Sequence, residues 1–212
     1  MVDRFPHYDV LAKRDTPSWN PQTRKVIGDR LATEEPEVLT PGQRATLRAV
    51  VDRIVPQPEQ RPATNATALV LHKIMTNESD GFRHHELPQV REAWERGLDA
   101  IDAEAQERLG HPFAILDGDK ADEILRAIEQ GDVQAAAWAS LPAMLFWSWR
   151  LIPDIVSAYY AHPSAWSAMG FGGPAAPRGY VRLQANRRDP WEAAERDDGR
   201  VISAEERNIH VG

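Results

Sequence analysis

The residues with the clearest potential for chemistry are the consecutive pair His84 and His85, which precede Glu86. Imidazole and carboxylate groups are common metal ligands. Ligands on one helix normally lie three or four residues apart, as in H-E-x-x-H, because that spacing puts them on one face. The adjacent histidines lack this spacing, so we expect no metal site in this chain.

Acidic residues gather in a short segment, at Asp117, Asp119, Asp122 and Glu123. A calcium loop of the EF-hand type needs ligands at alternate positions, a glycine at the sixth position and a glutamate at the twelfth, and this segment lacks that pattern. Carboxylates also favour the start of a helix, where they face the positive end of the helix dipole. The cluster therefore predicts a helix N-terminus.

Glycines at positions 170, 172, 173 and 179 could form a loop that binds phosphate. However, the sequence contains neither G-x-G-x-x-G between a strand and a helix nor G-x-x-x-x-G-K-[ST]. It also lacks a G-x-S-x-G elbow, and no trio of serine, histidine and acid can be singled out. We therefore predict no catalytic residue and no cofactor-binding residue in this chain.

Large aromatic side chains are concentrated in an apolar segment around Arg150; they are Trp138, Phe146, Trp147, Trp149, Tyr159 and Tyr160. A central core helix explains most of them, because large apolar side chains usually face a core. The alternative is a surface for a partner protein, since tryptophan, tyrosine and arginine are favoured at binding hot spots.

The composition limits the classes of protein to consider. With 212 residues, 42% hydrophobic and 27% charged, the chain can form one sizeable core, or one domain with irregular arms. Its net charge of −7 disfavours nucleic acid as a partner, because phosphate binding needs clustered lysine and arginine. Without cysteine, the chain forms no disulfide, no thiolate zinc site and no cysteine-ligated iron–sulfur cluster.

The chain shows no obvious membrane or export segment. The uncharged stretch at residues 133–149 contains Pro142 and is shorter than the roughly 20 apolar residues that span a bilayer. The first residues include Asp3, His7 and Asp9 and no apolar run, so no signal peptide is visible. We expect no transmembrane segment and a cytoplasmic location, with export on a partner's signal as the alternative.

Helical spacing dominates the middle of the chain. Thr40 to Gln43 forms a capping-box pattern with Pro41 at the first helical position. From Leu87 to Leu109, apolar residues recur every three or four positions, and Gly110 supplies a stop. We predict further helices after Asn20, over residues 66–75, 117–131 and 133–160, with the last one kinked or divided by Pro142 and Pro153. Because alternating apolar runs bounded by tight turns are missing, the protein is predicted to be mainly α.

The stretch from His162 to Pro174, followed by Gly179 and Tyr180, resembles the end of the helical domain in the gluconate 2-dehydrogenase subunit 3 family. That family typically closes its domain with an aromatic residue, a Gly-aromatic-x-Gly-Pro turn and then Gly-Tyr. Earlier segments resemble the family in the same order: Leu39 to Leu47 with Ile54 to Pro56, then Gly97 to Asp102 with Arg108 to Phe113. The resemblance covers residues 39–180.

Members of this family resemble small subunits of dehydrogenases whose large subunit is a flavoprotein of the glucose-methanol-choline type. The resemblance implies that FAD and the catalytic histidine belong to the large subunit, and that the small one supports folding, stability or export of its partner. Many members carry a twin-arginine signal, and this sequence shows none. We expect a non-catalytic, chaperone-like subunit without its own cofactor; the alternative is an independent helical enzyme or small-molecule-binding protein with a pocket between helices.

The expected organisation has three parts: an N-terminal arm with a short helix (1–38), a helical domain of about five to seven helices (39–180) and a polar C-terminal tail (181–212). Irregular arms that bear aromatic residues can become ordered by docking on another surface, so the arms are predicted to wrap a partner. The predicted partner interface consists of Phe5, Tyr8, Trp19, Trp147, Arg150, Trp166, Phe171, Pro174, Tyr180 and Trp191.

Overall fold

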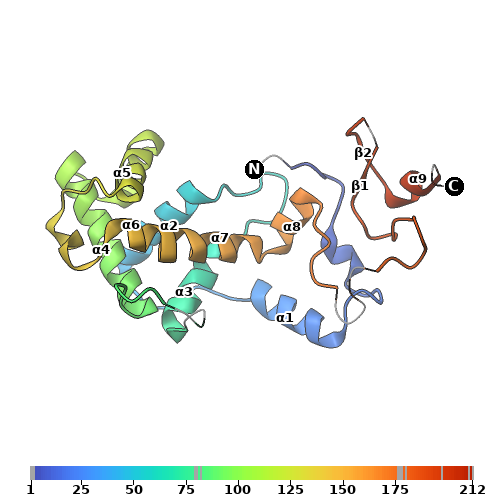
Figure 1. The fold of residues 1–212 in the computed structure, drawn as a ribbon, viewed down its shortest axis with the longest axis horizontal. Coiled ribbons are helices and arrows are strands. Elements are labelled where there is room, and N and C mark those ends of the chain that lie inside the picture. Colours follow the sequence, from blue (N-terminus) through green and yellow to red (C-terminus); the bar gives the residue numbers. More distant parts are fainter. Residues whose placement is uncertain are drawn as a thin grey trace. The chain divides into compact units, whose positions relative to one another are not determined.

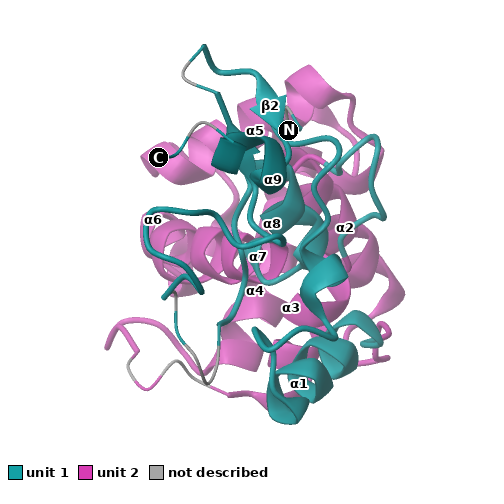
Figure 2. Ribbon diagram, turned by 90° about the vertical axis from the view of Figure 1, so that its right-hand side faces the viewer, with its two compact units in different colours: residues 1–33, 57–64, 160–212 teal, residues 34–56, 65–159 magenta. Residues whose placement is uncertain are grey.

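The computed structural model describes residues 3–78, 81, 83–175, 179, 181–196, 198–209 and 211. Contacts within the chain divide it into two compact units, coloured separately in Figure 2. Unit 1 consists of residues 1–33, 57–64 and 160–212, and unit 2 consists of residues 34–56 and 65–159.

Helices make up most of the described secondary structure, which confirms the predicted mainly α class (Figure 1). The α-helices are α1 (Pro21–Leu31), α2 (Pro41–Ile54), α3 (Ala66–Thr76), α4 (Val90–Leu109), α5 (Gly118–Gln130), α6 (Ala143–Phe146), α7 (Ile152–Tyr160), α8 (Pro163–Met169) and α9 (Ala204–Ile209). Short 3-10 helices are η1 (Val10–Lys13), η2 (Phe113–Ile115) and η3 (Ala136–Ser140), and η4 (Trp147–Leu151) is a π-helical turn. Strands β1 (Ala194–Glu195) and β2 (Val201–Ile202) form an antiparallel pair.

The helix boundaries of unit 2 follow local signals in the sequence. The capping box at the start of α2 is complete: Gln43 N donates to Thr40 Oγ1 at 3.2 Å and Thr40 N donates to Gln43 Oε1 at 3.1 Å. Asp117 caps α5 by accepting from Lys120 N at 3.0 Å, as the acidic cluster predicted. Helices α4 and α5 end at Gly110 and Gly131, both of which adopt the left-handed conformation that glycine tolerates best.

Unit 2 is organised around α4, which contacts α2, α3, α5 and α6. Its apolar side is fully buried at Trp94, Leu98 and Ile101. Gly97 lies on the same side, and the Phe146 ring of α6 packs so closely on it that a Cβ there would overlap the ring. The close packing of α6 on α4 therefore requires glycine, which has no side chain, at position 97.

The long apolar segment after residue 133 is divided, as its prolines predicted. Pro142 precedes α6, and Pro153 follows the π-helical turn η4. Pro153 has no N–H to donate to the carbonyl of Trp149, four residues earlier, and this loss is typical of a break in helical bonding. Arg150 Nε donates to that carbonyl oxygen instead, so the side chain of the turn supplies the missing hydrogen bond.

Unit 1 is built by the N-terminal residues packing on α8. Val10, Trp19 and Ile27 form one buried cluster with Trp166 of α8. Arg4 N donates to the Ala168 carbonyl at 3.0 Å, and Val10 N donates to Ser167 Oγ at 3.0 Å. In this structure, the N-terminal arm therefore docks on a helix of its own chain.

The C-terminal tail contains the short hairpin β1–β2, in which Ala194 pairs with Ile202 and Glu195 with Val201. The sequence did not predict these strands, because two residues per strand are too few to show an alternating pattern. Arg4 binds Glu195 at 2.7 Å, which links the hairpin to the N-terminal residues within unit 1. Within the described residues, none of the helices has both the length and the apolar character needed to cross a membrane.

Candidate functional site

The turn from Gly170 to Pro174 ends α8 and carries the motif that the sequence singled out. Helix α8 begins at Pro163, and the neutral His162 ring caps it by accepting from Ser164 N at Nδ1, 3.1 Å away. It ends at Gly170, which has a φ of 73°. Phe171 N donates to the Trp166 carbonyl at 2.8 Å, so the first N–H groups of the turn complete the helix cap.

Two glycines allow the turn to pack against its neighbours. A Cβ at Gly170 would overlap the Phe5 ring, and a Cβ at Gly173 would lie 2.9 Å from Trp166 Cε3. Both glycines also have a positive φ, which strains other residues. The glycines thus serve a left-handed turn with aromatic rings packed on its backbone.

Lys13 and Trp19 donate hydrogen bonds to carbonyl groups of the turn. The Lys13 side chain, only 2% exposed, donates to the carbonyl oxygens of Gly172 and Pro174. Trp19 Nε1 donates to the Pro174 carbonyl at 2.8 Å. A phosphate loop presents backbone N–H groups to an anion, whereas this turn presents oxygens to a cation. Its polarity is therefore opposite to that of a phosphate cradle.

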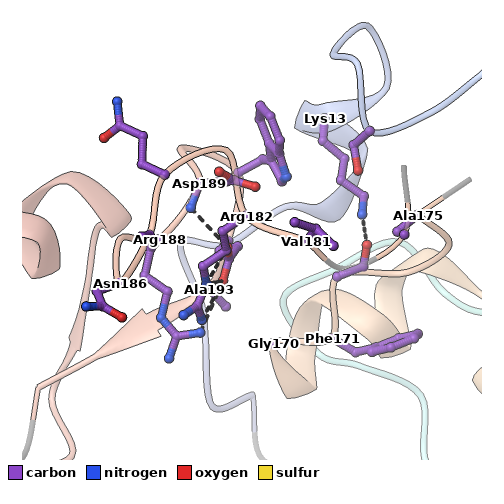
Figure 3. Close-up of a pocket in the computed structure, with 17 residues that line it drawn as sticks. Lys13, Gly170, Phe171, Ala175, Val181, Arg182, Asn186, Arg188, Asp189 and Ala193 are labelled. Atoms are coloured by element: carbon purple, nitrogen blue, oxygen red, sulfur yellow. Dashed lines mark hydrogen bonds and ion pairs between the residues drawn. The ribbon is translucent and has the colours of Figure 1, made fainter. Parts of the chain in front are cut away.

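A pocket of 610 Å³ lies beside this turn, within unit 1 (Figure 3). Lys13, Phe171 and Val181 line one part of it, and Arg182, Arg188 and Asp189 line another. Figure 3 shows the Lys13 ammonium directed at the turn rather than at the tail residues. The pocket is thus formed by the turn and the tail, unlike the pocket between helices that the alternative function supposed.

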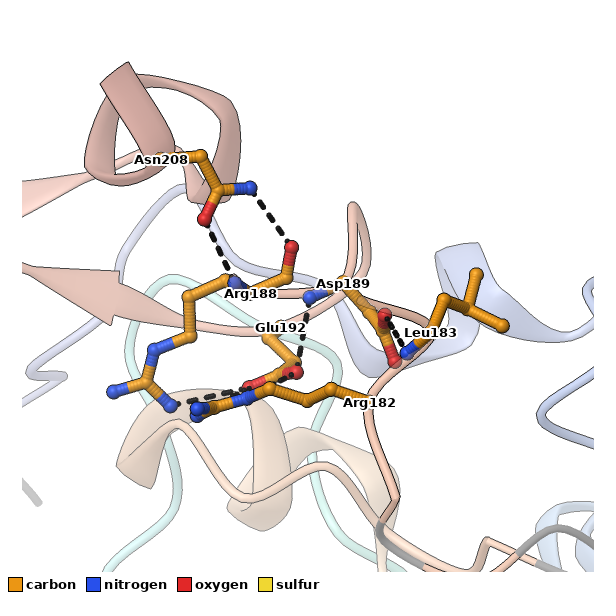
Figure 4. A network of polar contacts seen from close by, with 6 residues as sticks. All are labelled: Arg182, Leu183, Arg188, Asp189, Glu192 and Asn208. Atoms are coloured by element: carbon orange, nitrogen blue, oxygen red, sulfur yellow. Dashed lines mark hydrogen bonds and ion pairs between the residues drawn. The ribbon is translucent and has the colours of Figure 1, made fainter. Parts of the chain in front are cut away.

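Glu192 organises the polar side of the pocket (Figure 4). Its carboxylate accepts from Arg182 Nε at 3.0 Å, from Arg188 Nη1 at 3.1 Å and from Asp189 N at 3.0 Å. Burial by itself raises the pKa of Glu192, but these hydrogen bonds outweigh it and lower the pKa below the usual glutamate value. Both guanidinium groups are therefore bound to a carboxylate of the same tail.

The structure places the predicted interface residues of unit 1 in different environments. Phe5, Trp19 and Trp166 are buried, while Phe171 is 43% exposed and packs edge-on against Trp166, with 6.0 Å between ring centres. Pro174 and Trp191 are half-buried. Tyr180 lies outside the described residues.

Tyr8, another predicted interface residue, is half-buried, and its hydroxyl is buried without a hydrogen-bond partner among the described residues. Burial, and then the nearby charges of Asp9 and Glu192, raise the pKa of Tyr8 to about 12. The hydroxyl is therefore neutral at physiological pH.

In unit 2, Trp147 and Arg150 both belong to η4; Trp147 is half-buried and Arg150 is buried. Asp154 accepts from Lys73 Nζ at 2.8 Å and from Trp94 Nε1 at 2.9 Å, and Arg150 Nη1 lies 3.7 Å from its Oδ2. The buried Asp154 carboxylate of α7 thus binds the half-buried Lys73 of α3 and the Trp94 indole of α4. Because a buried charge needs such partners, the cluster explains why Arg150 points inward.

The histidine pair forms an aromatic contact rather than a cluster of ligands. The rings of His84 and His85 stack with 4.8 Å between their centres, and His84 lies 5.6 Å from the Trp149 ring. His84 Nδ1 accepts from Glu86 N at 3.3 Å. Among the residues that the structure describes, no group of three histidine or acidic side chains is placed to hold a metal ion.

Sequence reasoning missed Lys13 and Glu192, which organise the turn and the pocket. Lys13 stands in an irregular segment, and its partners are 159 and 161 positions away. Glu192 is one of many charges in a polar tail. Only Trp191 beside it marked that segment as a possible contact region.

The fold and the turn define a mainly helical protein whose domain closes on a Gly-Phe-Gly-Gly-Pro segment. The chain matches the family model described as gluconate 2-dehydrogenase subunit 3 over residues 41–173, more than half of its 212 residues. It therefore belongs to the gluconate 2-dehydrogenase subunit 3 family, as its motifs predicted. Comparisons with curated proteins and with solved structures gave no match.

Proposed function

We propose that the chain is the non-catalytic small subunit of a dehydrogenase, and that it binds and stabilises an FAD-containing large subunit of the glucose-methanol-choline type. The observation that carries this proposal is the family match, which covers most of unit 2 together with α8 and the glycine turn. In this account, the flavin and the reacting groups belong to the large subunit. The small subunit supplies contact surface.

The polar groups of unit 1 support a packing role. The carbonyls of Gly172 and Pro174 bind Lys13, and the guanidinium groups of Arg182 and Arg188 bind Glu192. Substrate binding needs polar groups directed at a ligand. Groups that are bound within the protein contribute to a stable surface instead.

The exposed aromatic residues also support contact with another protein. Phe171 is held at the end of α8 by a glycine turn and by the Trp166 ring. An aromatic side chain on a rigid base loses little entropy on binding, which favours binding hot spots. We extend the proposal to the location: the complex forms in the cytoplasm, and export on a signal of the large subunit is the alternative.

Co-expression with a flavin oxidoreductase of the glucose-methanol-choline type from the same genome tests this function. The large subunit should be recovered with this chain in one complex that carries FAD, and its soluble yield should fall when the chain is omitted. The purified chain alone should show no dehydrogenase activity and no bound flavin. Activity or a bound substrate in the isolated chain would instead support the independent enzyme or binding protein.

A further inference from the structure

Unit 2 has a groove of 250 Å³ where α5 passes η4 and α7. Its apolar lining is formed by Ile54, Leu125, Trp147 and Ile152, which come from α2, α5, η4 and α7. Its charged lining is formed by Arg53, Asp122, Arg126 and Glu129, which come from α2 and α5. The groove thus combines an apolar strip with charges contributed from one side.

The charges on the α5 side alternate in sign. Asp122 binds Arg53 at 2.6 Å and lies 3.7 Å from Arg126, one helical turn further along. Glu129 follows Arg126 on the same helix after three more positions. An occupant therefore meets an acid, a base and an acid in order along this side.

The segment η4–α7, which supplies Trp147 and Ile152 to the groove, carries no exposed charge. Arg150 and Asp154 are the only charged residues between Val133 and Tyr160, and both are buried. The side chains that reach solvent along η4 and α7 are uncharged: Trp147, Ser148, Trp149, Ile152, Pro153, Val156, Ser157 and Tyr160. These exposed positions include the polar Ser148 and Ser157, but none of the charged residues that a surface helix usually also presents to water.

The π-helical turn leaves two tryptophans partly exposed, of which Trp147 lines the groove. Residues that are two apart lie on different sides of a regular α-helix, yet Trp147 and Trp149 both reach solvent in part. The extra residue of a π turn rotates the side chains that follow it, and such turns are frequent at functional sites. Arg150 stabilises the turn from beneath through the Trp149 carbonyl and Asp154.

We propose that this groove binds one amphipathic helix of the large subunit, with apolar residues against Trp147 and Ile152 and an acidic residue opposite Arg126. The proposal rests on the proposed function, because it requires a large subunit. A helix with an apolar stripe matches the apolar lining, and one charged flank matches the alternating charges of α5. A membrane surface matches less well, because interfacial helices carry basic residues and this groove contains as many acids as bases.

Substitutions in the groove of the co-expressed complex test the proposal. Ile152→Glu places a charge on the apolar strip, and Arg126→Glu reverses an exposed charge without touching the core. Ile115→Glu is the matched control, because Ile115 is 69% exposed in unit 2 and does not line the groove. Dissociation on dilution, followed by mass photometry, should show about tenfold weaker binding or more for Ile152→Glu. Arg126→Glu should weaken binding less, and Ile115→Glu should match the unmodified chain.

The occupant is identified by photo-crosslinking from benzoylphenylalanine at position 147. The expected crosslink joins one segment of the large subunit that has apolar residues at helical spacing. Unchanged binding of both groove variants, or a crosslink to a second copy of this chain, would overturn the groove proposal. The proposed function would still stand, because the complex would still form. If the unmodified chain forms no complex at all, the proposed function fails first.

Discussion

His162 makes the start of α8 depend on the charge of one imidazole ring. Its Nδ1 atom accepts from Ser164 N, which only an unprotonated nitrogen can do. Burial, and then the positive charge of Arg30, lower the pKa of His162 below its ordinary value of 6.5. The unfolded chain therefore takes up the proton at a higher pH than the folded chain.

The free energy of unfolding should reflect this difference. Above pH 6.5, the neutral His162 makes its full contribution to the free energy of unfolding. This contribution is lost as the pH falls through the lower pKa that His162 has in the folded chain. His162→Asn keeps a cap acceptor that does not titrate, so it should make the free energy of unfolding less dependent on pH between 7.5 and about 5. Urea unfolding at several pH values measures this, and equal pH slopes for the variant and the unmodified chain would contradict the role of His162.

Single residues differ in how well the sequence predicted them. Thr40, Asp117 and Gly110 were predicted because a helix end is decided by residues a few positions away. Trp19 and Trp166 were predicted at a partner interface, and the structure places both in the core of unit 1. Their role in binding stays a prediction, since an aromatic residue in an irregular segment can pack on its own chain or on another.

Gly97 decides how closely α6 approaches α4. Gly97→Ala should improve helix propensity by about 1 kcal/mol, but its Cβ would overlap the Phe146 ring. Overpacking of this kind costs about 1–3 kcal/mol, so the net effect on the free energy of unfolding should be destabilising.

Gly28→Ala is the matched control for Gly97→Ala. Gly28 also lies inside a helix, and a Cβ there would meet nothing within 4 Å. This variant should be neutral or more stable by up to about 1 kcal/mol. Thermal unfolding compares the two variants, and a stabilising effect of Gly97→Ala would contradict the close packing of α6 on α4.

Helices could be predicted from the sequence where apolar spacing and caps agreed, as in α2, α4 and α5. The prolines predicted that the segment after residue 133 is divided, but not that it contains a π turn. That turn depends on the Arg150 side chain reaching a carbonyl and on Asp154 binding groups from α3 and α4. Contacts between residues far apart in the sequence leave no local pattern.

Contacts within the chain divide it into two compact units, and the three-part organisation of arm, helical domain and tail stays a prediction. Residues at both ends contribute to unit 1. Arg4 binds Glu195 of the C-terminal tail, and Arg61 binds Asp3 and the carbonyls of Phe5 and Tyr8. Removing residues 1–33 would therefore expose Trp166 and its neighbours. Loss of a complex after that truncation would reflect loss of structure as well as loss of contact, so exposed single substitutions are the sharper test of binding.

Thermal stability of the flavoprotein partner is the most direct measure of a stabilising subunit. A subunit that binds only the folded state of its partner raises the partner's free energy of unfolding. The increase is about 2.7 kcal/mol when the free concentration of the subunit is a hundred times the dissociation constant. The release of FAD, followed by its fluorescence during heating, should shift to higher temperature as this chain is added, and the shift should grow with its concentration. An unchanged release temperature at saturating concentrations would contradict the proposed stabilising function.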